Sequence, residues 1–300
     1  MSIRPIKQVF HTKPTLEGAG VRLQRAFGFG KTHEFDPFLL LDDFRNDNPE
    51  DYLAGFPWHP HRGIETITYV LAGSVAHGDS LGNKGSLGAG DVQWMTAGSG
   101  ILHQEMPKGD PQGRMHGFQL WANLPASLKM TDPRYQDIAA KDIPEVTDDD
   151  GTSVRVVCGE FWGKKGPVEG VAADPQYVDV SVPPGKRKTL AIETNRNAFA
   201  YVFAGSGMFR DASAPQPVKT EQVGSAGVSD EPITNRSLVL FDRGDEIVVQ
   251  AGDEGIRFLL VSGTPLKEPV AWSGPIVMNT QDQIQQAYKE LQEGTFIKHR

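Results

Sequence analysis

The chain has 300 residues, 38% of them hydrophobic and 23% charged, which excludes disordered, collagen-like and coiled-coil proteins. Thirty lysines and arginines against 38 aspartates and glutamates give a formal net charge of −8, so direct nucleic-acid binding is not expected. The single cysteine, Cys158, excludes an internal disulfide framework, and neither the first residues (MSIRPIKQVF) nor any later run has the apolar length of a signal peptide or membrane span. We therefore expect a cytoplasmic protein of one or two domains.

Short strands separated by glycine-containing turns are predicted from residue 3 to residue 121. Residues 65–71 (ETITYVL) are rich in β-branched and aromatic types, and a turn at 72–74 separates them from a strand at 75–77, which is a hairpin-like signal. Turns at 88–91 and 98–100 precede further strands at 92–95 and 101–103. Regular short strands of this kind indicate an all-β sandwich or barrel.

The polar segment 145–151 (EVTDDDG) has few side chains that could fill a core, and we interpret it as the boundary between two halves. An ordinary surface loop is the alternative. The strand pattern resumes at 154–157, 177–182 and 237–241. Residues 211–235 contain proline, serine, glycine and charges without periodicity, which predicts a long mobile loop inside the second half.

A short repeat connects the two halves. Residues 69–74 (YVLAGS) recur as 201–206 (YVFAGS), and residues 90–91 (GD) recur as 244–245. Six residues can match by chance, but strand-like sequence surrounds both copies and the turns follow in the same order. We therefore predict a duplicated β-barrel unit.

The chain ends on one predicted amphipathic helix. Thr280 and Gln283 have the spacing of a capping box, and Gly294 is placed to end the helix. Apolar residues occupy positions i, i+3, i+4 and i+7 in between, namely Ile284, Ala287, Tyr288 and Leu291. We expect this stripe to pack on a barrel face, with docking of a partner protein as the alternative.

Seven of the eight histidines precede residue 117, and the eighth, His299, lies at the end of the chain, so a histidine-based site belongs to the first half. His59 and His61 are two residues apart, as are His103 and Glu105. On an extended chain such residues point to the same side, with backbones about 6 to 7 Å apart. Two strands that carry these pairs predict one metal site inside a barrel mouth.

The residue types indicate an open metal site. Three imidazoles and one carboxylate suit Fe, Cu, Ni or Zn, whereas a closed structural zinc site favours cysteine ligands. On a six-coordinate ion, four ligands leave positions for water, dioxygen or a bidentate organic substrate, which implies catalysis or sensing. The simpler interpretation, that each pair is only a polar strand edge, fits an isolated pair better than two pairs in a β context.

Other candidates for the metal are weaker. Glu65 is a rival ligand, although we expect it deeper in the barrel or hydrogen-bonded to a ligand imidazole. His77 and His116 are weak candidates, and His116 is expected to line the pocket or to bond a backbone carbonyl. His11 and His33 are interpreted as surface or loop residues.

The repeat offers an internal test of the second half. The 132-residue offset of the first repeat carries His59 and His61 onto Ala191 and Glu193. The 154-residue offset of the second carries His103 and Glu105 onto Arg257 and Leu259. A second metal site is therefore not expected, and the interior of the second barrel should be filled by apolar side chains.

Three segments resemble the pirin family of the cupin superfamily over nearly the whole chain: 56–66 (FPWHPHRGIET), 90–105 (GDVQWMTAGSGILHQE) and 274–280 (GPIVMNT). The resemblance implies a bicupin fold of two antiparallel β-barrels, which we divide into a metal-binding N-terminal cupin barrel (1–146), a degenerate C-terminal cupin barrel (147–272) and a tail and helix that pack on the barrels (273–300). It also implies one divalent metal, with Fe(II) first and Mn, Ni, Co, Cu or Zn as alternatives. The residues that match the family's ligands are His59, His61, His103 and Glu105.

The resemblance implies two different activities. Some members are quercetin 2,3-dioxygenases, in which the residue matching Glu105 would accept the flavonol proton before dioxygen opens the ring with loss of carbon monoxide. Others are transcriptional co-regulators whose iron oxidation state alters binding to a protein partner. Because Arg22, Arg25 and Lys31 are interpreted as a solvated face rather than a DNA-binding patch, we expect the dioxygenase, with a flavonol-like substrate, O2 and a monomeric state.

Overall fold

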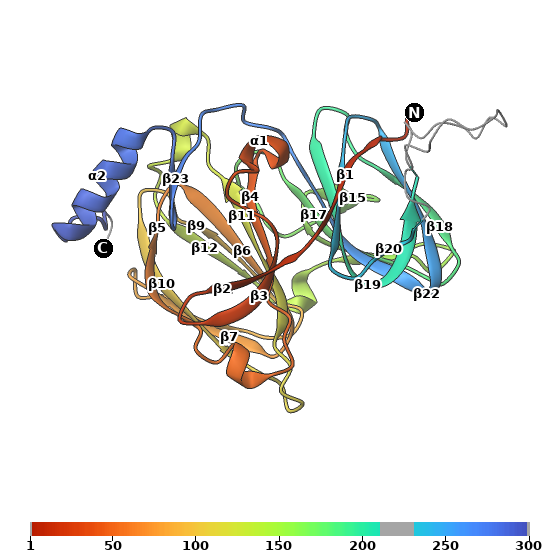
Figure 1. Ribbon diagram of the computed structural model, residues 1–300, viewed down its shortest axis with the longest axis horizontal. Coiled ribbons are helices and arrows are strands. Elements are labelled where there is room, and N and C mark those ends of the chain that lie inside the picture. The colour runs from red at the N-terminus through yellow and green to blue at the C-terminus, as the bar shows by residue number, and fades with distance from the viewer. Residues whose placement is uncertain (1, 211–230, 299–300) are drawn as a thin grey trace.

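The computed structural model describes residues 2–210 and 231–298, which form two β-sandwiches side by side with one helix at the far end of the first (Figure 1). The all-β prediction is confirmed. No helix among these residues is both long and apolar enough to cross a bilayer. Most of the predicted loop 211–235, and His299, lie outside the described residues.

The first sandwich contains a large and a small antiparallel sheet. The large sheet has the spatial order β12 (Arg134–Ile138), β9 (Val92–Thr96), β6 (Ile64–Ala72), β11 (His116–Asn123), β4 (Phe38–Asp43), β3 (Val21–Phe27) and β2 (Lys13–Glu17). The small sheet has the order β5 (Phe56–His61), β10 (Ile101–Lys108), β7 (Ser74–Asp79) and β8 (Lys84–Leu87).

The second sandwich repeats this order. Its main path is β1 (Ile6–His11), β21 (Ser237–Phe241), β19 (Asn197–Phe209), β22 (Glu246–Gly263), β17 (Gln176–Val182), β14 (Ser153–Cys158) and β13 (Glu145–Thr147). Two further strands pair beside this path, β18 (Arg187–Ala191) with β22 and β20 (Ile233–Thr234) with β19.

Short elements connect these strands. They are α1 (Thr32–Phe35), the 3-10 turns Pro49–Asp51, Ala126–Leu128 and Ala140–Asp142, and the small pairs β15 (Glu160–Phe161) with β16 (Lys164–Lys165) and β23 (Ala271–Ser273) with β24 (Ile276–Met278).

The sequence repeat occupies the same place in both sandwiches, on β6 in the first and β19 in the second, so the predicted duplication agrees with the strand order. Gly73 and Gly205 both have positive φ, +79° and +65°; Gly73 lies between β6 and β7, which belong to different sheets, and Gly205 lies at an irregularity inside β19. The predicted 65–77 hairpin is wrong, because β6 pairs with β9 and β11 while β7 pairs with β8 and β10. The chain does turn at 72–74, but this turn connects strands of two different sheets.

Each end of the chain completes the opposite sandwich. The N-terminal strand β1 pairs with β21 of the second sandwich, and the C-terminal segment returns to the first, where residues 271–278 form β23 and β24 (Figure 1). Segment 145–151 forms β13 and the turn into β14 at the edge of the second sheet. The division at 146 and 272 stays a prediction.

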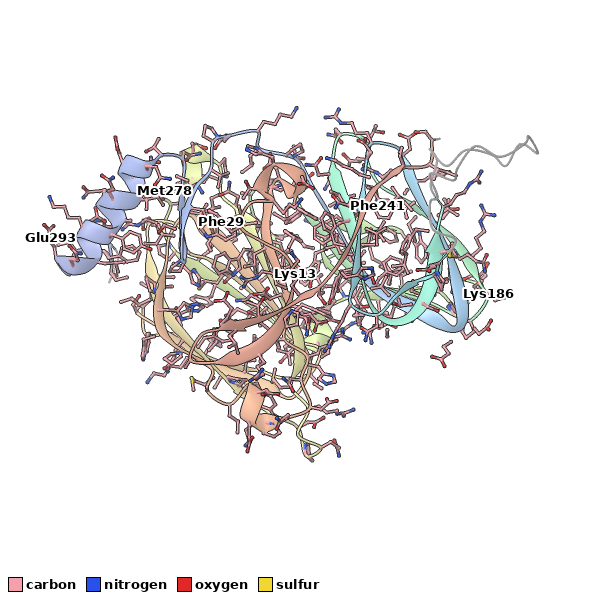
Figure 2. The ribbon with its side chains drawn as sticks, in the orientation of Figure 1. Lys13, Phe29, Lys186, Phe241, Met278 and Glu293 are labelled. Atoms are coloured by element: carbon pink, nitrogen blue, oxygen red, sulfur yellow. The ribbon has the colours of Figure 1, made fainter. Side chains whose placement is uncertain are left out.

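The C-terminal helix α2 (Gln281–Gln292) has the predicted cap. The Thr280 hydroxyl accepts from the Gln283 amide, and the Gln283 side chain accepts from the Thr280 amide. Ile284 and Ala287 are buried against the β23–β24 pair. Figure 2 shows Glu293, beyond the end of this helix, and Lys186 of the second sandwich at opposite ends of the molecule.

The two large sheets face each other across a shared apolar layer, and reciprocal hydrogen bonds cross it. Tyr69 of the first sandwich donates to Asp179 of the second at 2.8 Å, and Tyr201 of the second donates to Asp43 of the first at 2.6 Å. The interior of the second sandwich is a separate cluster of aliphatic and phenylalanine side chains, as predicted. The two sandwiches are therefore held together by matching residues of the repeat.

Candidate metal centre

The two predicted ligand pairs lie on neighbouring strands of the small sheet. Strands β5 and β10 pair antiparallel, with His59 directly opposite His103 and a bulge before Glu105. Pro57 and Pro60 are tolerated because β5 is the edge strand of this sheet. The alternation of an extended chain then directs His59 and His61 to the same side.

Three imidazoles converge in the interior of the first sandwich. One ring nitrogen from each of His59, His61 and His103 lies within 4.8 Å of the others. The ring of His103 lies 4.3 Å from that of His59 and 5.0 Å from that of His61, measured between centroids. These three residues form the only such group of histidine, cysteine and carboxylate side chains in 2–210 and 231–298 that could hold an ion.

Hydrogen bonds to carbonyls fix two of the three tautomers. The Nδ1 atoms of His59 and His61 lie 2.9 Å and 3.1 Å from the carbonyl oxygens of Pro57 and Pro275, so each Nδ1 carries the proton. The two Nε2 lone pairs then face each other at 3.1 Å, an arrangement that a cation between them stabilises. Two nitrogens bound at about 2.1 Å and about 90° would lie roughly 3 Å apart, so the pair fits adjacent ligands of one metal.

Burial prepares these imidazoles as neutral ligands. Neither ring nitrogen of the fully buried His103 has a hydrogen-bond partner, which is costly unless a ligand engages one of them. Burial, reinforced by His59, lowers the pKa of His61 to about 3, and burial also lowers the pKa of His103. Both rings are therefore unprotonated at neutral pH and can bind a metal without losing a proton.

Glu105 is buried beside the same interior, where polar side chains of the large sheet hold its carboxylate. The Thr68 hydroxyl lies 3.1 Å from its Oε1 and 2.6 Å from Gln119 Oε1, and Gln119 Nε2 lies 3.5 Å from Glu105 Oε2. Burial raises the pKa of Glu105, although its hydrogen bonds and the nearby His59 oppose this. Ligation of the metal by Glu105 stays a prediction, because the three imidazoles alone make the compact group.

A cavity of about 620 Å³ opens onto His59, His61 and Glu105. Its remaining walls are mostly apolar, and they include Val21, Leu23, Leu40, Phe44, Tyr52, Val75, Met115 and Trp121. A predominantly apolar cavity with a few polar groups is typical of a small-molecule site. An organic ligand in this cavity can therefore lie against His59 and His61, next to an ion held by the three imidazoles.

The C-terminal segment supplies one side of this site, which the sequence pattern did not predict. Trp272, Gly274 and Pro275 line the cavity, and the Pro275 carbonyl is the partner of His61. At the mouth, the exposed Phe29 packs edge-on against Trp272, with centroids 5.6 Å apart (Figure 2 labels Phe29). The motif-like segment 274–280 was the available signal, but nothing in its residue types indicated a contact with His61.

Glu65 is neither inside the first barrel nor hydrogen-bonded to a ligand imidazole, so that expectation is wrong, and Glu65 is not part of the ligand group. On β6 the odd-numbered residues Ile67 and Tyr69 face the layer between the sandwiches, whereas Thr68 faces Glu105. Glu65 shares the odd-numbered face and accepts from the Thr96 hydroxyl at 2.8 Å. Burial raises the pKa of Glu65 at this position.

The other histidines lie outside the imidazole group. His77 is buried in the first sandwich, with its Nε2 3.5 Å from Asp137, and His116 pairs with Asp47 at 2.6 Å instead of with a backbone carbonyl. His11 ends β1 and His33 is exposed on α1, in agreement with the surface interpretation.

Arg25 is not part of a solvated face, so this expectation is also wrong. Its Nε and Nη2 donate to the two oxygens of Asp42 at 2.8 Å and 2.7 Å, and its Nη1 lies 2.8 Å from Glu17. All three residues line the cavity. Burial raises the pKa of Asp42 to about 6, against the opposing effect of Arg25. Only Arg22 and Lys31 of the predicted group lie at the surface, in pairs with Asp51 and Glu34.

The described residues of the second sandwich contain no comparable group of ligands, and the offsets identified the wrong positions. Ala191 and Glu193 are exposed, Arg257 binds Asp179, and Leu259 lies in the layer between the sandwiches. The strand that pairs with β18 is the first part of β22, residues 246–250. The interior there is lined by Leu190, Ile192, Ile247 and Val249.

Comparisons with known proteins agree with this architecture. The family model described as pirin matches residues 20–122, and the pirin C-terminal cupin domain matches residues 177–297. A pirin-like protein of Caulobacter vibrioides is 43% identical over 99% of this chain and 100% of its own length. A crystal structure described as quercetin 2,3-dioxygenase from Acinetobacter baumannii is 30% identical, covers 98% of this chain and 99% of its own, and has a TM-score of 0.85.

A solved bacterial pirin of Escherichia coli, described as a complex with nickel(II), shares the fold at a TM-score of 0.62 and 21% identity, over 86% of this chain and 99% of its own. The family models match both halves of the bicupin arrangement, and the Caulobacter relative matches nearly the full length. The chain therefore belongs to the pirin family.

Proposed function

We propose that this pirin is a metal-dependent dioxygenase that opens the central ring of a flavonol-like substrate. The observation that carries the proposal is the mostly apolar cavity of about 620 Å³, which is lined by His59, His61 and the buried Glu105 beside the point where three imidazoles converge. The Acinetobacter protein described as a quercetin 2,3-dioxygenase supports the same reaction class. A metal sensor that acts through a protein partner would not require such a cavity.

His59, His61, His103 and, in this proposal, Glu105 would hold one divalent ion, with Fe(II) as the first expectation. A bound ion would lower the pKa of the substrate hydroxyl and supply the redox chemistry that dioxygen requires. The Pro57 and Pro275 carbonyls hold two of the imidazoles with Nε2 directed inward, so these ligands need no rearrangement.

Glu105 accepts the proton of the substrate hydroxyl in this mechanism. Burial raises the pKa of its carboxyl, which makes the carboxylate a stronger base than an exposed one. Thr68 and Gln119 hold the carboxylate at the cavity wall. Because ligation of a metal lowers the basicity of a carboxylate, Glu105 would act as the base either as a loosely held ligand or while free of the ion.

The reaction is a balanced dioxygenation. Both atoms of one O2 are incorporated, two carbon–carbon bonds of the central ring break, and the carbon between them leaves as carbon monoxide. The apolar walls exclude water from this chemistry, which limits competing hydrolysis of reactive intermediates.

The test is carbon monoxide release by protein that has been loaded with Fe(II) under argon and then given oxygen and quercetin. We expect one carbon monoxide per substrate consumed, and a loss of at least about 100-fold in Glu105→Gln, which keeps the shape of the side chain but removes the base. Metal binding without gas release from the wild-type protein would overturn the dioxygenase in favour of a sensor.

A further inference from the structure

The cavity has one charged wall, formed by Glu17, Arg25 and Asp42, which the proposed chemistry does not use. Arg25 directs two nitrogens to Asp42 and the third to Glu17, at 2.7 to 2.8 Å. Three of the five N–H donors of the guanidinium are therefore used within the protein, and its positive charge faces two carboxylates.

The carboxylates of Glu17 and Asp42 can accept further hydrogen bonds besides those from Arg25. A carboxylate offers about four lone-pair sites, and the Arg25 fork occupies one on each oxygen of Asp42. Glu17 and Asp42 together with Arg25 carry a net charge of −1, so this wall accepts hydrogen bonds and repels anions. It lies beside the apolar side chains Leu23 and Leu40.

The strand register places this wall within reach of a ligand at the imidazoles. Asp42 is directly opposite Gln119 on the neighbouring strand, and Gln119 contacts Glu105. Asp42 is therefore about one strand spacing, roughly 5 Å, from Gln119, and Gln119 reaches Glu105 on the facing sheet. Because the same cavity is lined by Glu17, Asp42, His59 and His61, one planar molecule of two or three rings can lie in it with one end toward each group.

We propose that the Glu17–Arg25–Asp42 wall is the subsite that binds phenolic hydroxyls on the far ring of the substrate, while the other end of the substrate lies at His59 and His61. This inference rests on the proposed function, and it narrows the substrate class to planar polyphenols without a carboxylate on that ring. Hydroxyls donate to Glu17 and Asp42, whereas a carboxylate there faces like charge.

The experiment measures binding instead of turnover. Protein loaded with redox-inactive zinc is titrated, under argon, with 3-hydroxyflavones that carry no substituent, two adjacent hydroxyls or one carboxylate on the pendant phenyl ring. Quenching of tryptophan fluorescence gives each Kd. We expect the dihydroxy probe to bind about tenfold more tightly than the unsubstituted one, and the carboxylate probe to bind more weakly than both.

Three variants assign this preference to residues. Glu17→Gln and Asp42→Asn remove one acceptor charge each, and both should reduce the preference for hydroxyls and improve binding of the carboxylate probe. Asp110→Asn is the matched control, because Asp110 pairs with Arg114 outside the cavity. Glu17 is the more exposed acceptor, so Glu17→Gln decides the result if the buried Asp42→Asn fails to fold.

The possible outcomes distinguish failure of the subsite proposal from failure of the dioxygenase proposal. Equal affinity of the wild type for all three probes, or a preference that persists in Glu17→Gln, overturns the subsite and leaves the dioxygenase proposal intact. If not even the unsubstituted probe binds the wild type, both proposals fail. Loss of the preference in Glu17→Gln but not in Asp110→Asn supports the subsite.

Discussion

The two sandwiches share a strand order but differ along one row of paired residues that crosses the interior face of each large sheet. In the first sandwich the row consists of Arg25, Asp42, Gln119, Thr68, Gln93 and Asp137. At the corresponding places in the second it consists of Val156, Val178, Leu260, Ala200, Val239 and Val9. Every polar position in the first row has an apolar counterpart in the second.

The opposite face of each large sheet does not show this difference. Tyr69 and Tyr201 occupy the same place in the repeat, and each donates to an aspartate of the other sandwich. The same strand order thus supports a cavity with a polar row in the first sandwich and a filled apolar core in the second. The outer faces of both large sheets retain the contacts that join the two sandwiches. The chemistry resides in one face of one sheet, and the fold alone does not determine it.

The largest expected effect comes from replacing one of the three grouped histidines of the first sandwich by an apolar residue. His103→Leu should reduce bound metal from about one ion per chain to almost none, measured by elemental analysis after dialysis. The metal-free variant should unfold at no lower urea concentration than the metal-free wild type, because two buried nitrogens without partners are removed.

The matched control for this variant is His116→Leu, which removes an imidazole that pairs with Asp47 outside the metal group. It should keep its metal. A His103→Leu protein with a full complement of metal would show that the ion lies elsewhere.

The second prediction concerns Asp42, whose counterpart Val178 has no charge. Its pKa is raised by burial from 3.8 to about 6, so between these pH values the folded state binds more protons than the unfolded state. The stabilising contribution of Asp42 to the unfolding free energy is therefore fully present below about pH 4 and is lost as the pH rises through about 6. This loss lowers the unfolding free energy by about 3 kcal/mol.

Urea unfolding of the metal-free wild type and of Asp42→Asn at pH 4.5, 5.5 and 6.5 isolates this effect as the difference between the two proteins. Relative to the variant, the wild type should become less stable as the pH rises. A relative gain in stability would mean that the Arg25 fork outweighs burial and lowers the pKa of Asp42.

The third prediction tests the symmetry of the joint. Tyr69→Phe and Tyr201→Phe each remove a buried hydrogen bond to a carboxylate and should each lower the unfolding free energy by about 1.5 to 3 kcal/mol. Tyr177→Phe is the control, because the Tyr177 hydroxyl is buried in the same layer without a hydrogen-bond partner. A loss of unfolding free energy in only one of the two variants would contradict the reciprocal arrangement.

The smallest expected effect comes from Thr68→Ala, which places alanine where the second sandwich has Ala200. The loss of the hydroxyl frees the Glu105 carboxylate and should lower the turnover number for carbon monoxide release by about 10- to 100-fold. Thr68→Ser, which keeps the hydroxyl, should recover most of the rate. Equal rates in the serine and alanine variants would remove Thr68 from the positioning of Glu105.

The sequence was sufficient to predict the strands, the capped helix and the adjacency of the two ligand-bearing segments. These depend on local periodicity: a two-residue spacing directs His59 and His61 to one side, and the spacing of Thr280 and Gln283 defines the cap. The repeat also predicted the duplicated strand order, because its two copies lie on the corresponding strands β6 and β19 and both contain a glycine with positive φ.

The errors came from relations between distant segments. A turn after β6 looks the same in sequence whether the next strand pairs with it or crosses to another sheet. Both faces of β6 are buried, so its residues gave no alternation that would assign Glu65 to the outer face. Arg25 resembled a surface residue because its partner Asp42 lies on another strand, and no local pattern predicted that Pro275 contacts His61.

The exchange of the chain ends has a consequence for biosynthesis. His61 gains its partner carbonyl only after residue 275 has been made, and β1 is made long before its pairing partner β21. The group of three imidazoles is therefore held as described only after residue 275 has emerged from the ribosome. A truncation just before β23 removes a wall of the cavity although every histidine of the centre is retained.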